Sequence, residues 1–277
     1  MVNVTLFCAL DGWLASRYRG GPGVHDRPLP GYMAVVPVIF LTAVLAYGHW
    51  QIVGYESSRA NHPRLRVALL QGDVALDVKW NEAYRDRIFR LYEELTRRVV
   101  EGKPQLVVWP ETALPCYFQA DEPSRQQVLL LARDHNVHLL FGSLGYHERD
   151  GRFEPNNSAF FVSPGNEVLG RYDKVHLVPF GEYVPFRWVF FFVERVVEGT
   201  GNMVPGDDLP VLAFPGGRFG VLICFEIIFP ELARSYVRRG AQFLVTITND
   251  SWFGRSAAPY QHFAIAVIEH AAHGCHP

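Results

Sequence analysis

Short apolar runs alternate with longer amphipathic stretches along the chain after residue 65, and this alternation limits the possible folds more than any other feature. Residues 66–73 (RVALLQGD) predict a buried strand, whereas residues 81–102 carry apolar side chains at helical spacing. Strands are expected again over 104–112 and 137–146, with a helix over 123–136 between them. Strands that alternate with amphipathic helices predict an α/β fold.

The second half of the chain continues this pattern. Residues 157–174 predict a β-hairpin around a Pro-Gly-Asn turn. A strand over 219–229 then leads into a helix over 230–239, and residues 241–250 predict a further strand. The α/β domain is therefore expected to extend over most of the chain beyond the first sixty residues.

Composition excludes several classes of protein. The chain has 277 residues, of which 49% are hydrophobic, so it can bury a substantial core. Its formal net charge of −2 gives no basic excess, and no nucleic-acid partner is expected. The four cysteines and eleven histidines are scattered and form no CxxC or HExxH motif, so neither a metal site nor a disulfide framework is predicted.

One segment departs from the pattern of a soluble domain. Residues 33–50 contain no Asp, Glu, Lys or Arg, and about 18 such residues can cross a bilayer as a helix. We expect an N-terminal membrane segment over 1–56, with its span at about 33–53, and a catalytic domain over 57–277. The alternative is a buried helix of the globular domain. Arginines lie on both sides of the segment and do not orient it.

Polar residues follow three of the expected strands at their carboxyl ends. Glu111 follows LVVWP, Cys224 follows GVLI, and Asn249 and Asp250 follow FLVTIT. Open α/β sheets place their sites at this edge. Each residue also has a structural explanation, because a free cysteine is often simply buried and Glu111 could cap a helix.

A fourth segment, residues 171–185 (RYDKVHLVPFGEYVP), carries a lysine and a glutamate in a stretch with little periodicity. Loops of this kind often hold functional groups. Lys174 could equally be a solvated charge, which is the usual environment of a lysine.

Four motifs occur in a characteristic order: VVWPET, RYDKVHLVPFGEYVP, GVLICFEIIFPE and TNDSWFG. Together they resemble the nitrilase superfamily of carbon–nitrogen hydrolases, which implies an α/β fold of the αββα sandwich type. QGDVALDVKW at 71–80, PFGEYVP, and NDSWFG followed by Gln-His are more similar to the apolipoprotein N-acyltransferase family, a membrane-bound branch of that superfamily. The resemblance covers about residues 30–272.

The resemblance implies a Glu-Lys-Cys triad. Cys224 would be the nucleophile that forms a thioester, and Glu111 would be the general base for its thiol proton. Lys174 would stabilise the oxyanion together with the backbone N–H of Phe225. No cofactor is implied.

Further roles follow from the same motifs. Glu182 and Glu226 would support Lys174 and the region of the nucleophile, although either could be purely structural. Trp109, Tyr183 and Trp252 would bind substrate in an acyl pocket, or else be core aromatics. Residues 186–199 (FRWVFFFVERVVEG) would form an amphipathic lid that enters lipid, or part of the core.

The implied reaction transfers a fatty acyl group from a membrane phospholipid to the N-terminal amine of a diacylglyceryl-cysteine lipoprotein. The implied location is the bacterial inner membrane, with the catalytic domain in the periplasm. Two alternatives are a hydrolytic amidase or nitrilase, and an inactive fragment. The second arises because the family has more N-terminal spans and continues beyond residues 268–277, so the chain resembles one truncated at both ends.

Overall fold

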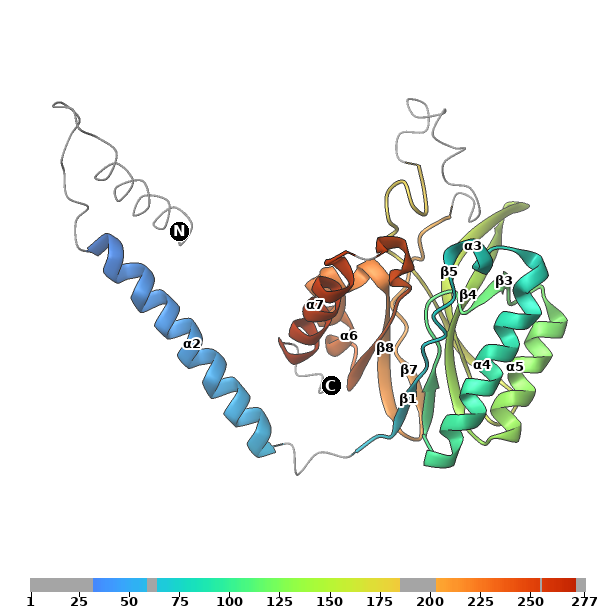
Figure 1. Ribbon diagram of the computed structural model, residues 1–277, viewed down its shortest axis with the longest axis horizontal. Helices are drawn as coiled ribbons and strands as arrows, with labels where there is room; N and C mark the ends of the chain where they lie inside the picture. Colours follow the sequence, from blue (N-terminus) through green and yellow to red (C-terminus); the bar gives the residue numbers. More distant parts are fainter. Residues whose placement is uncertain (1–31, 59–63, 185–202, 255, 273–277) are drawn as a thin grey trace. The chain divides into compact units, whose positions relative to one another are not determined.

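The computed structural model describes residues 32–58, 64–184, 203–254 and 256–272 (Figure 1). The chain divides into two units, residues 1–64 and 65–277. In the first unit, α2 runs over Tyr32–Ser58. Its stretch Val35–Gly54 has the length and composition of a membrane span, and no part of that stretch is buried. The predicted boundary between residues 56 and 57 stays a prediction.

The second unit contains nine strands, together with α-helices and short 3-10 helices, among its described residues. The strands are β1 (Val67–Leu69), β2 (Leu106–Val108), β3 (Leu114–Tyr117), β4 (His138–Arg149), β5 (Arg152–Val162), β6 (Val168–Asp173), β7 (Leu212–Phe214), β8 (Gly217–Ile223) and β9 (Phe243–Ile247). The α-helices are α3 (Leu76–Lys79), α4 (Arg85–Val99), α5 (Glu122–Asp134), α6 (Pro230–Arg238) and α7 (Ala258–Ala272). The 3-10 helices are η2 (Glu82–Tyr84), η3 (Val100–Gly102), η5 (Cys224–Ile228) and η6 (Asp250–Phe253).

These strands form two sheets. The larger sheet has the order β1-β2-β4-β5-β6, with β3 beside β4, and the smaller has the order β7-β8-β9. Strands β1, β2 and β4 are parallel, whereas β4, β5 and β6 are antiparallel neighbours. In the smaller sheet, β8 and β9 are parallel. The parallel strands bring their carboxyl ends to one edge, where the candidate site lies.

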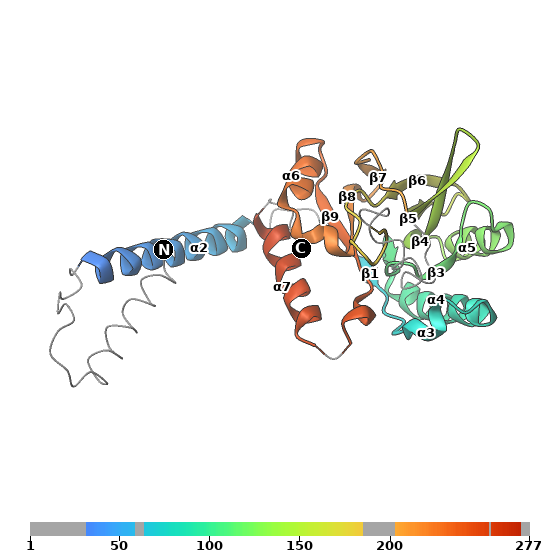
Figure 2. The ribbon, with the colours of Figure 1, turned by 90° about the horizontal axis from the view of Figure 1, so that it is seen from above.

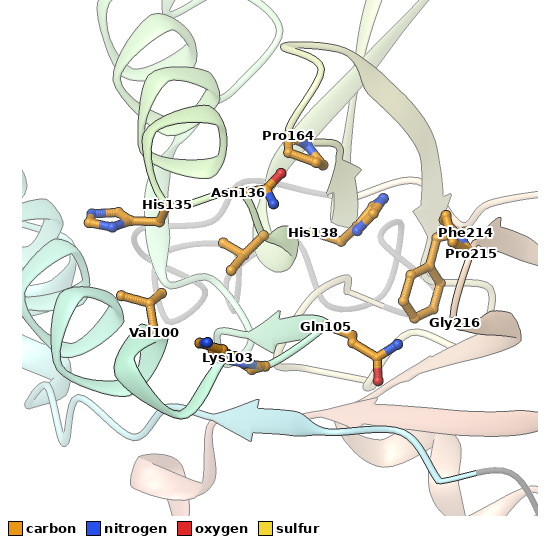
Figure 3. A pocket seen from close by; sticks show the side chains of 12 residues that line it. Val100, Lys103, Gln105, His135, Asn136, His138, Pro164, Phe214, Pro215 and Gly216 are labelled. Carbon is orange, nitrogen blue, oxygen red and sulfur yellow. The ribbon is translucent and has the colours of Figure 1, made fainter.

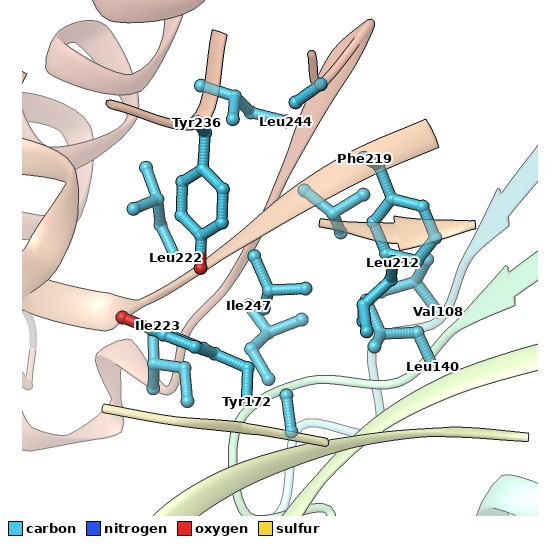
Figure 4. Close-up of a cluster of buried hydrophobic side chains, with 14 of the residues drawn as sticks. Val108, Leu140, Tyr172, Leu212, Phe219, Leu222, Ile223, Tyr236, Leu244 and Ile247 are labelled. Carbon is cyan, nitrogen blue, oxygen red and sulfur yellow. The ribbon is translucent and has the colours of Figure 1, made fainter. Parts of the chain in front are cut away.

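Alternate residues of the larger sheet enter two different cores. Val108, Leu140 and Phe161 pack against the smaller sheet (Figure 4), whereas Val107 and Leu139 pack against α4 and α5. This follows from the period of two along a strand. Helices α6 and α7 lie on the far side of the smaller sheet (Figure 2). The architecture is therefore the expected αββα sandwich.

Three elements differ from the sequence-based expectation. The buried strand expected over 66–73 is the short β1, whose Val67 and Leu69 are exposed because β1 lies at the edge of the larger sheet. The strand expected over 219–229 ends at Ile223, because Cys224 turns to φ = 53° and begins η5. The helix expected over 81–102 is divided into η2, α4 and η3. Local apolar periodicity does not reveal such changes in backbone direction, whereas capping does. The Asn81 side chain, for example, accepts a hydrogen bond from the Ala83 N–H at the start of η2.

Candidate active site

Three sequence-predicted residues lie just beyond the carboxyl ends of different strands: Glu111 after β2, Lys174 after β6 and Cys224 after β8. The Lys174 Nζ atom lies 3.7 Å from Glu111 Oε1 and 2.9 Å from Glu182 Oε2. The charges of Glu111 and Lys174 are both close enough to Cys224 to shift the pKa of its thiol. The fold therefore brings the three together.

Lys174 is 1% exposed, and a lysine at such a position needs charged partners. Burial alone would lower its pKa, but the carboxylates of Glu111 and Glu182 outweigh burial and raise the pKa above the ordinary value. The side chain is therefore a permanent ammonium at physiological pH. Glu182 makes the direct ion pair with Lys174, and its Oε2 also accepts the Val178 N–H at 2.8 Å; its supporting role stays a prediction.

The carboxylate of Glu111 accepts hydrogen bonds from a residue on β5 and from a residue after β9. Its Oε1 accepts a hydrogen bond from Asn157 Nδ2 at 2.7 Å, and its Oε2 accepts one from the Asn249 N–H at 2.9 Å. The same Asn157 nitrogen donates to Glu182 Oε1 at 2.7 Å. Asn157 on β5 therefore fixes the spacing between the two carboxylates.

The backbone at Glu111 is also constrained. Lys79 is buried and its Nζ donates to the Glu111 carbonyl oxygen at 2.9 Å. Thr112, the next residue, has φ = 46°, a left-handed conformation that costs free energy for a β-branched residue. A Cβ at Gly142 would lie 2.4 Å from the Thr112 nitrogen, so only glycine allows this close approach.

Cys224 is buried at a strained position, with φ = 53° between β8 and η5. Burial and the charge of Glu111 raise the pKa of the thiol to about 12, against the opposing effects of Lys174 and a hydrogen bond with Thr248. The resting thiol is therefore protonated. A reaction at this sulfur needs a base, and Glu111 is the carboxylate that raises the thiol pKa most strongly.

Glu226 holds the turn that carries Cys224. Its side chain is fully buried and accepts four hydrogen bonds, from donors on both β6 and β8 or directly after them. The donors are Tyr172 Oη at 2.7 Å, Val175 N at 2.8 Å, His176 N at 3.1 Å and Ile223 N at 2.8 Å. Glu226 thus ties the segment after Lys174 to the segment before Cys224, through four donors other than the Lys174 ammonium.

Other predicted residues lie elsewhere. Trp109 is fully buried against α4, stacks on Tyr92 and donates from Nε1 to Thr96 Oγ1 at 3.0 Å. This is the placement of a core aromatic, so we correct the expectation that Trp109 lines an acyl pocket. Its side chain leaves β2 on the helix side because strand residues alternate between faces. The ring of Phe225 packs edge-to-face on Phe229, and the role of its backbone N–H stays a prediction.

Substrate binding by Tyr183 and Trp252 stays a prediction, as does the lid. Tyr183 is partly buried in a tight turn, where its carbonyl oxygen accepts the Phe180 N–H at 2.8 Å. Trp252 lies in η6, and its side chain falls outside the described part of the chain. Residues 186–199, the predicted lid, lie entirely outside the described residues.

Sequence reasoning missed Asn157, Lys79 and Gly142 as site residues. Lys79 belongs to the motif QGDVALDVKW, which singled out the segment without assigning the lysine a role. No local signal marks Asn157 or Gly142, since their importance lies in contacts with Glu111 from strands distant in sequence.

A cavity of 480 Å³ lies at the opposite edge of the larger sheet (Figure 3). Its lining includes Gln105, just before β2, and His138, at the start of β4. These are the amino ends of the parallel strands, where open α/β sheets do not place their sites. The candidate site is therefore the cluster around Cys224 and not this cavity.

A thiol with a buried carboxylate and a buried ammonium can perform nucleophilic acyl transfer through a thioester. Among the residues that the structure describes, no group of three or more His, Cys, Asp and Glu side chains could hold a metal ion.

The αββα sandwich and this cluster are the features of a nitrilase-type protein. The carbon–nitrogen hydrolase family model matches residues 66–276, and the chain belongs to this family. The chain is also similar to an amidase from Nesterenkonia sp., with a TM-score of 0.53 and 24% identity over 74% of this chain and 72% of that one. That similarity shows the fold.

Curated relatives share more of the sequence. The chain is 39% identical over 269 residues to an apolipoprotein N-acyltransferase of Geobacter metallireducens, covering 97% of this chain and 49% of that protein. It is 32% identical over 234 residues to the Aquifex aeolicus protein of the same name, covering 84% of this chain and 51% of that one. The chain thus spans about half the length of these relatives.

Proposed function

We propose that this chain contains the catalytic domain of an apolipoprotein N-acyltransferase. It would transfer a fatty acyl group from a phospholipid, through a thioester on Cys224, to the N-terminal amine of a diacylglyceryl-cysteine lipoprotein. The observation that carries the proposal is the buried ammonium of Lys174 between the carboxylates of Glu111 and Glu182, beside Cys224. The names of the curated relatives favour acyl transfer over hydrolysis.

In the first half-reaction, Glu111 accepts the thiol proton and the Cys224 sulfur attacks the ester carbonyl carbon. The oxyanion of the tetrahedral intermediate is stabilised by Lys174 and by the Phe225 N–H. The C–O bond to glycerol then breaks. Glu111 returns its proton to the leaving oxygen, which releases a lysophospholipid and leaves an acyl thioester on Cys224.

In the second half-reaction, the neutral α-amine of the lipoprotein attacks the thioester carbonyl carbon. Glu111 takes a proton from the attacking nitrogen, and the same groups stabilise the second oxyanion. The C–S bond breaks as the amide forms, and the proton returns to the sulfur. No cofactor takes part in either step.

We place the chain in the bacterial inner membrane with its catalytic domain in the periplasm. The support is α2, whose Val35–Gly54 stretch has the length and composition of a span. A membrane anchor suits an enzyme whose donor substrate is a phospholipid of the same bilayer.

The proposal is tested by incubating the full chain in vesicles that contain phospholipid with a labelled acyl chain. We expect label on Cys224 that neutral hydroxylamine releases, and transfer of that label to a diacylated lipopeptide added afterwards. Cys224→Ser should lose both signals. Cys116→Ser, which changes another buried cysteine, should keep them.

Three results would contradict the proposal. Label released mainly as free fatty acid in the presence of the lipopeptide would indicate a hydrolase. Absence of any thioester would indicate an inactive chain. Lipopeptide acylation by Cys224→Ser would remove Cys224 as the nucleophile.

A further inference from the structure

A second group of polar side chains contacts Cys224, from the end of β9 and from α7. Strands β8 and β9 are parallel, with Ile223 paired to Ile247. Cys224 and Thr248 therefore come directly after paired positions and are neighbours across the two strands. The Thr248 hydroxyl is therefore placed beside the Cys224 thiol, and hydrogen bonding from it lowers the pKa of that thiol.

Thr248 is itself held by Asp250 and His262. Its Oγ1 donates to Asp250 Oδ1 at 2.9 Å, and the same carboxylate oxygen lies 2.9 Å from His262 Nδ1. The other ring nitrogen, Nε2, lies 3.0 Å from the carbonyl oxygen of Cys224. The contacts thus form a closed ring that begins at the sulfur of Cys224 and returns to its backbone.

The protons of this ring are limited by the chemistry of its members. A carbonyl oxygen and a carboxylate only accept hydrogen bonds, so His262 donates from both ring nitrogens and carries a positive charge. Thr248 has a single hydroxyl proton, and in the resting site it is directed to Asp250. On this side of the site the Cys224 thiol therefore faces an oxygen lone pair of Thr248 and not its proton.

Loss of the thiol proton reverses this contact. A thiolate can only accept hydrogen bonds, so the ring as it stands would leave the Thr248 oxygen facing a negative sulfur. Rotation about the Thr248 side chain redirects its proton from Asp250 to the sulfur. Asp250 keeps its partner His262 during the rotation, so its carboxylate does not lose every hydrogen bond when the Thr248 proton leaves it.

We propose that Thr248 is a further catalytic residue, whose hydroxyl turns from the Asp250 carboxylate to the Cys224 sulfur as the thiolate forms. This rests on the proposed role of Cys224 as the nucleophile. The thiol proton goes to Glu111, and Thr248 keeps its own proton throughout. Asp250 and His262 are positioning residues that hold the hydroxyl beside the sulfur and the Cys224 carbonyl in place.

Five groups set the charge around the sulfur. Burial raises the pKa of the Cys224 thiol most. Glu111 and Asp250 raise it further, whereas Lys174 and Thr248 lower it. His262 faces Asp250 and offsets its charge. Of these, Thr248 is the one neutral group, so its removal changes the thiolate contact without adding or removing a charge.

The test is the rate at which iodoacetamide alkylates Cys224 in the full chain, between pH 7 and pH 9. The thiolate is the reacting species, so the rate follows its stability. Trypsin releases residues 219–234, which contain no other cysteine, and mass spectrometry of this peptide gives the rate for Cys224 alone. We expect Thr248→Val to slow alkylation by about tenfold, the effect of one hydrogen bond to a charged group.

Two variants separate the hydroxyl from the packing of β9. Thr248→Ser keeps the hydroxyl and should alkylate within about twofold of the wild-type rate. Thr246→Val makes the same change two residues earlier, where the buried hydroxyl has no partner, and should leave the rate unchanged. Thr248→Ala should show the same loss as Thr248→Val.

The proposal is overturned if Thr248→Val and Thr248→Ala alkylate at the wild-type rate, if Thr248→Ser is as slow as they are, or if Thr246→Val is equally slow. These results concern the contact between hydroxyl and sulfur and do not depend on acyl transfer. Failure of the proposed function would be seen separately, as acylation of the lipopeptide by Cys224→Ser.

Discussion

The carboxylate of Glu111 and the ammonium of Lys174 lie 3.7 Å apart between Oε1 and Nζ, which is too long for a direct hydrogen bond. Glu182 makes the direct ion pair with Lys174 instead, at 2.9 Å. Because Glu182 pairs directly with Lys174, Glu111 can accept a proton while Lys174 stays charged. It also means that the two carboxylates depend on one buried cation.

Replacing that cation should affect both stability and chemistry. Lys174→Met leaves the carboxylates of Glu111 and Glu182 buried without a cation, which should cost about 3–5 kcal/mol of the free energy of unfolding. Adding Glu182→Gln should recover part of the stability and none of the thioester formation, because the oxyanion still lacks its ammonium. Urea unfolding and acyl labelling of Cys224 measure the two effects. Equal stability of the Lys174→Met chain and the wild type would contradict this account.

Gly142 should be required for the position of Glu111. A Cβ at this site would lie 2.4 Å from Thr112 N and 2.7 Å from Glu111 Cα, and backbone atoms cannot move aside cheaply. Gly142→Ala should lower the free energy of unfolding by about 1–3 kcal/mol. Displacement of Glu111 should slow thioester formation by about a hundredfold.

The matched control is Gly102→Ala, because a Cβ at Gly102 meets no atom within 4 Å. This variant should form the thioester at the wild-type rate. An active and equally stable Gly142→Ala chain would show that the Glu111 loop tolerates displacement.

Glu226→Gln should loosen the turn that carries Cys224. The amide group presents N–H donors where the carboxylate accepts from Tyr172, Val175, His176 and Ile223, so at least one buried donor loses its acceptor. We expect a loss of about 2–3 kcal/mol in the free energy of unfolding. The exposed Glu231, on the next helix, provides the control Glu231→Gln, which should have almost no effect on the same urea curve.

Lys79 should make stability increase with pH. Burial lowers the pKa of Lys79 from 10.5 to about 8, despite the opposing charge of Glu111. Between these two values the unfolded chain binds a proton that the folded chain does not, so the free energy of unfolding rises with pH, and below pH 8 the cost of burying the charge is present in full.

The measurement compares wild type with Lys79→Met, since the difference between them isolates this group. The free energy of unfolding of the wild type relative to Lys79→Met should increase by up to about 3 kcal/mol between pH 7.5 and pH 10.5. A difference that stays constant with pH would mean that Lys79 is not protonated differently in the folded and unfolded states.

The sequence predicted the class of fold and much of the cluster. Alternating apolar runs and amphipathic stretches gave the α/β pattern, because a strand and a helix bury their faces with different periods. The motifs placed Glu111, Lys174, Glu182 and Cys224 as a group before any distance was known. Each periodicity and each motif is a local feature, since it depends on residues that are close together in the chain.

Tertiary structure decided the contacts between segments. The strand expected over 219–229 ends at Ile223, where Glu226 accepts hydrogen bonds from the Ile223 N–H and from the Val175 N–H of a distant segment. Trp109 faces the helices because of the register of β2, which the motif could not show. Asn157 and Thr248 act through partners that follow other strands of the same sheet, and only the order of the strands in each sheet brings such residues together.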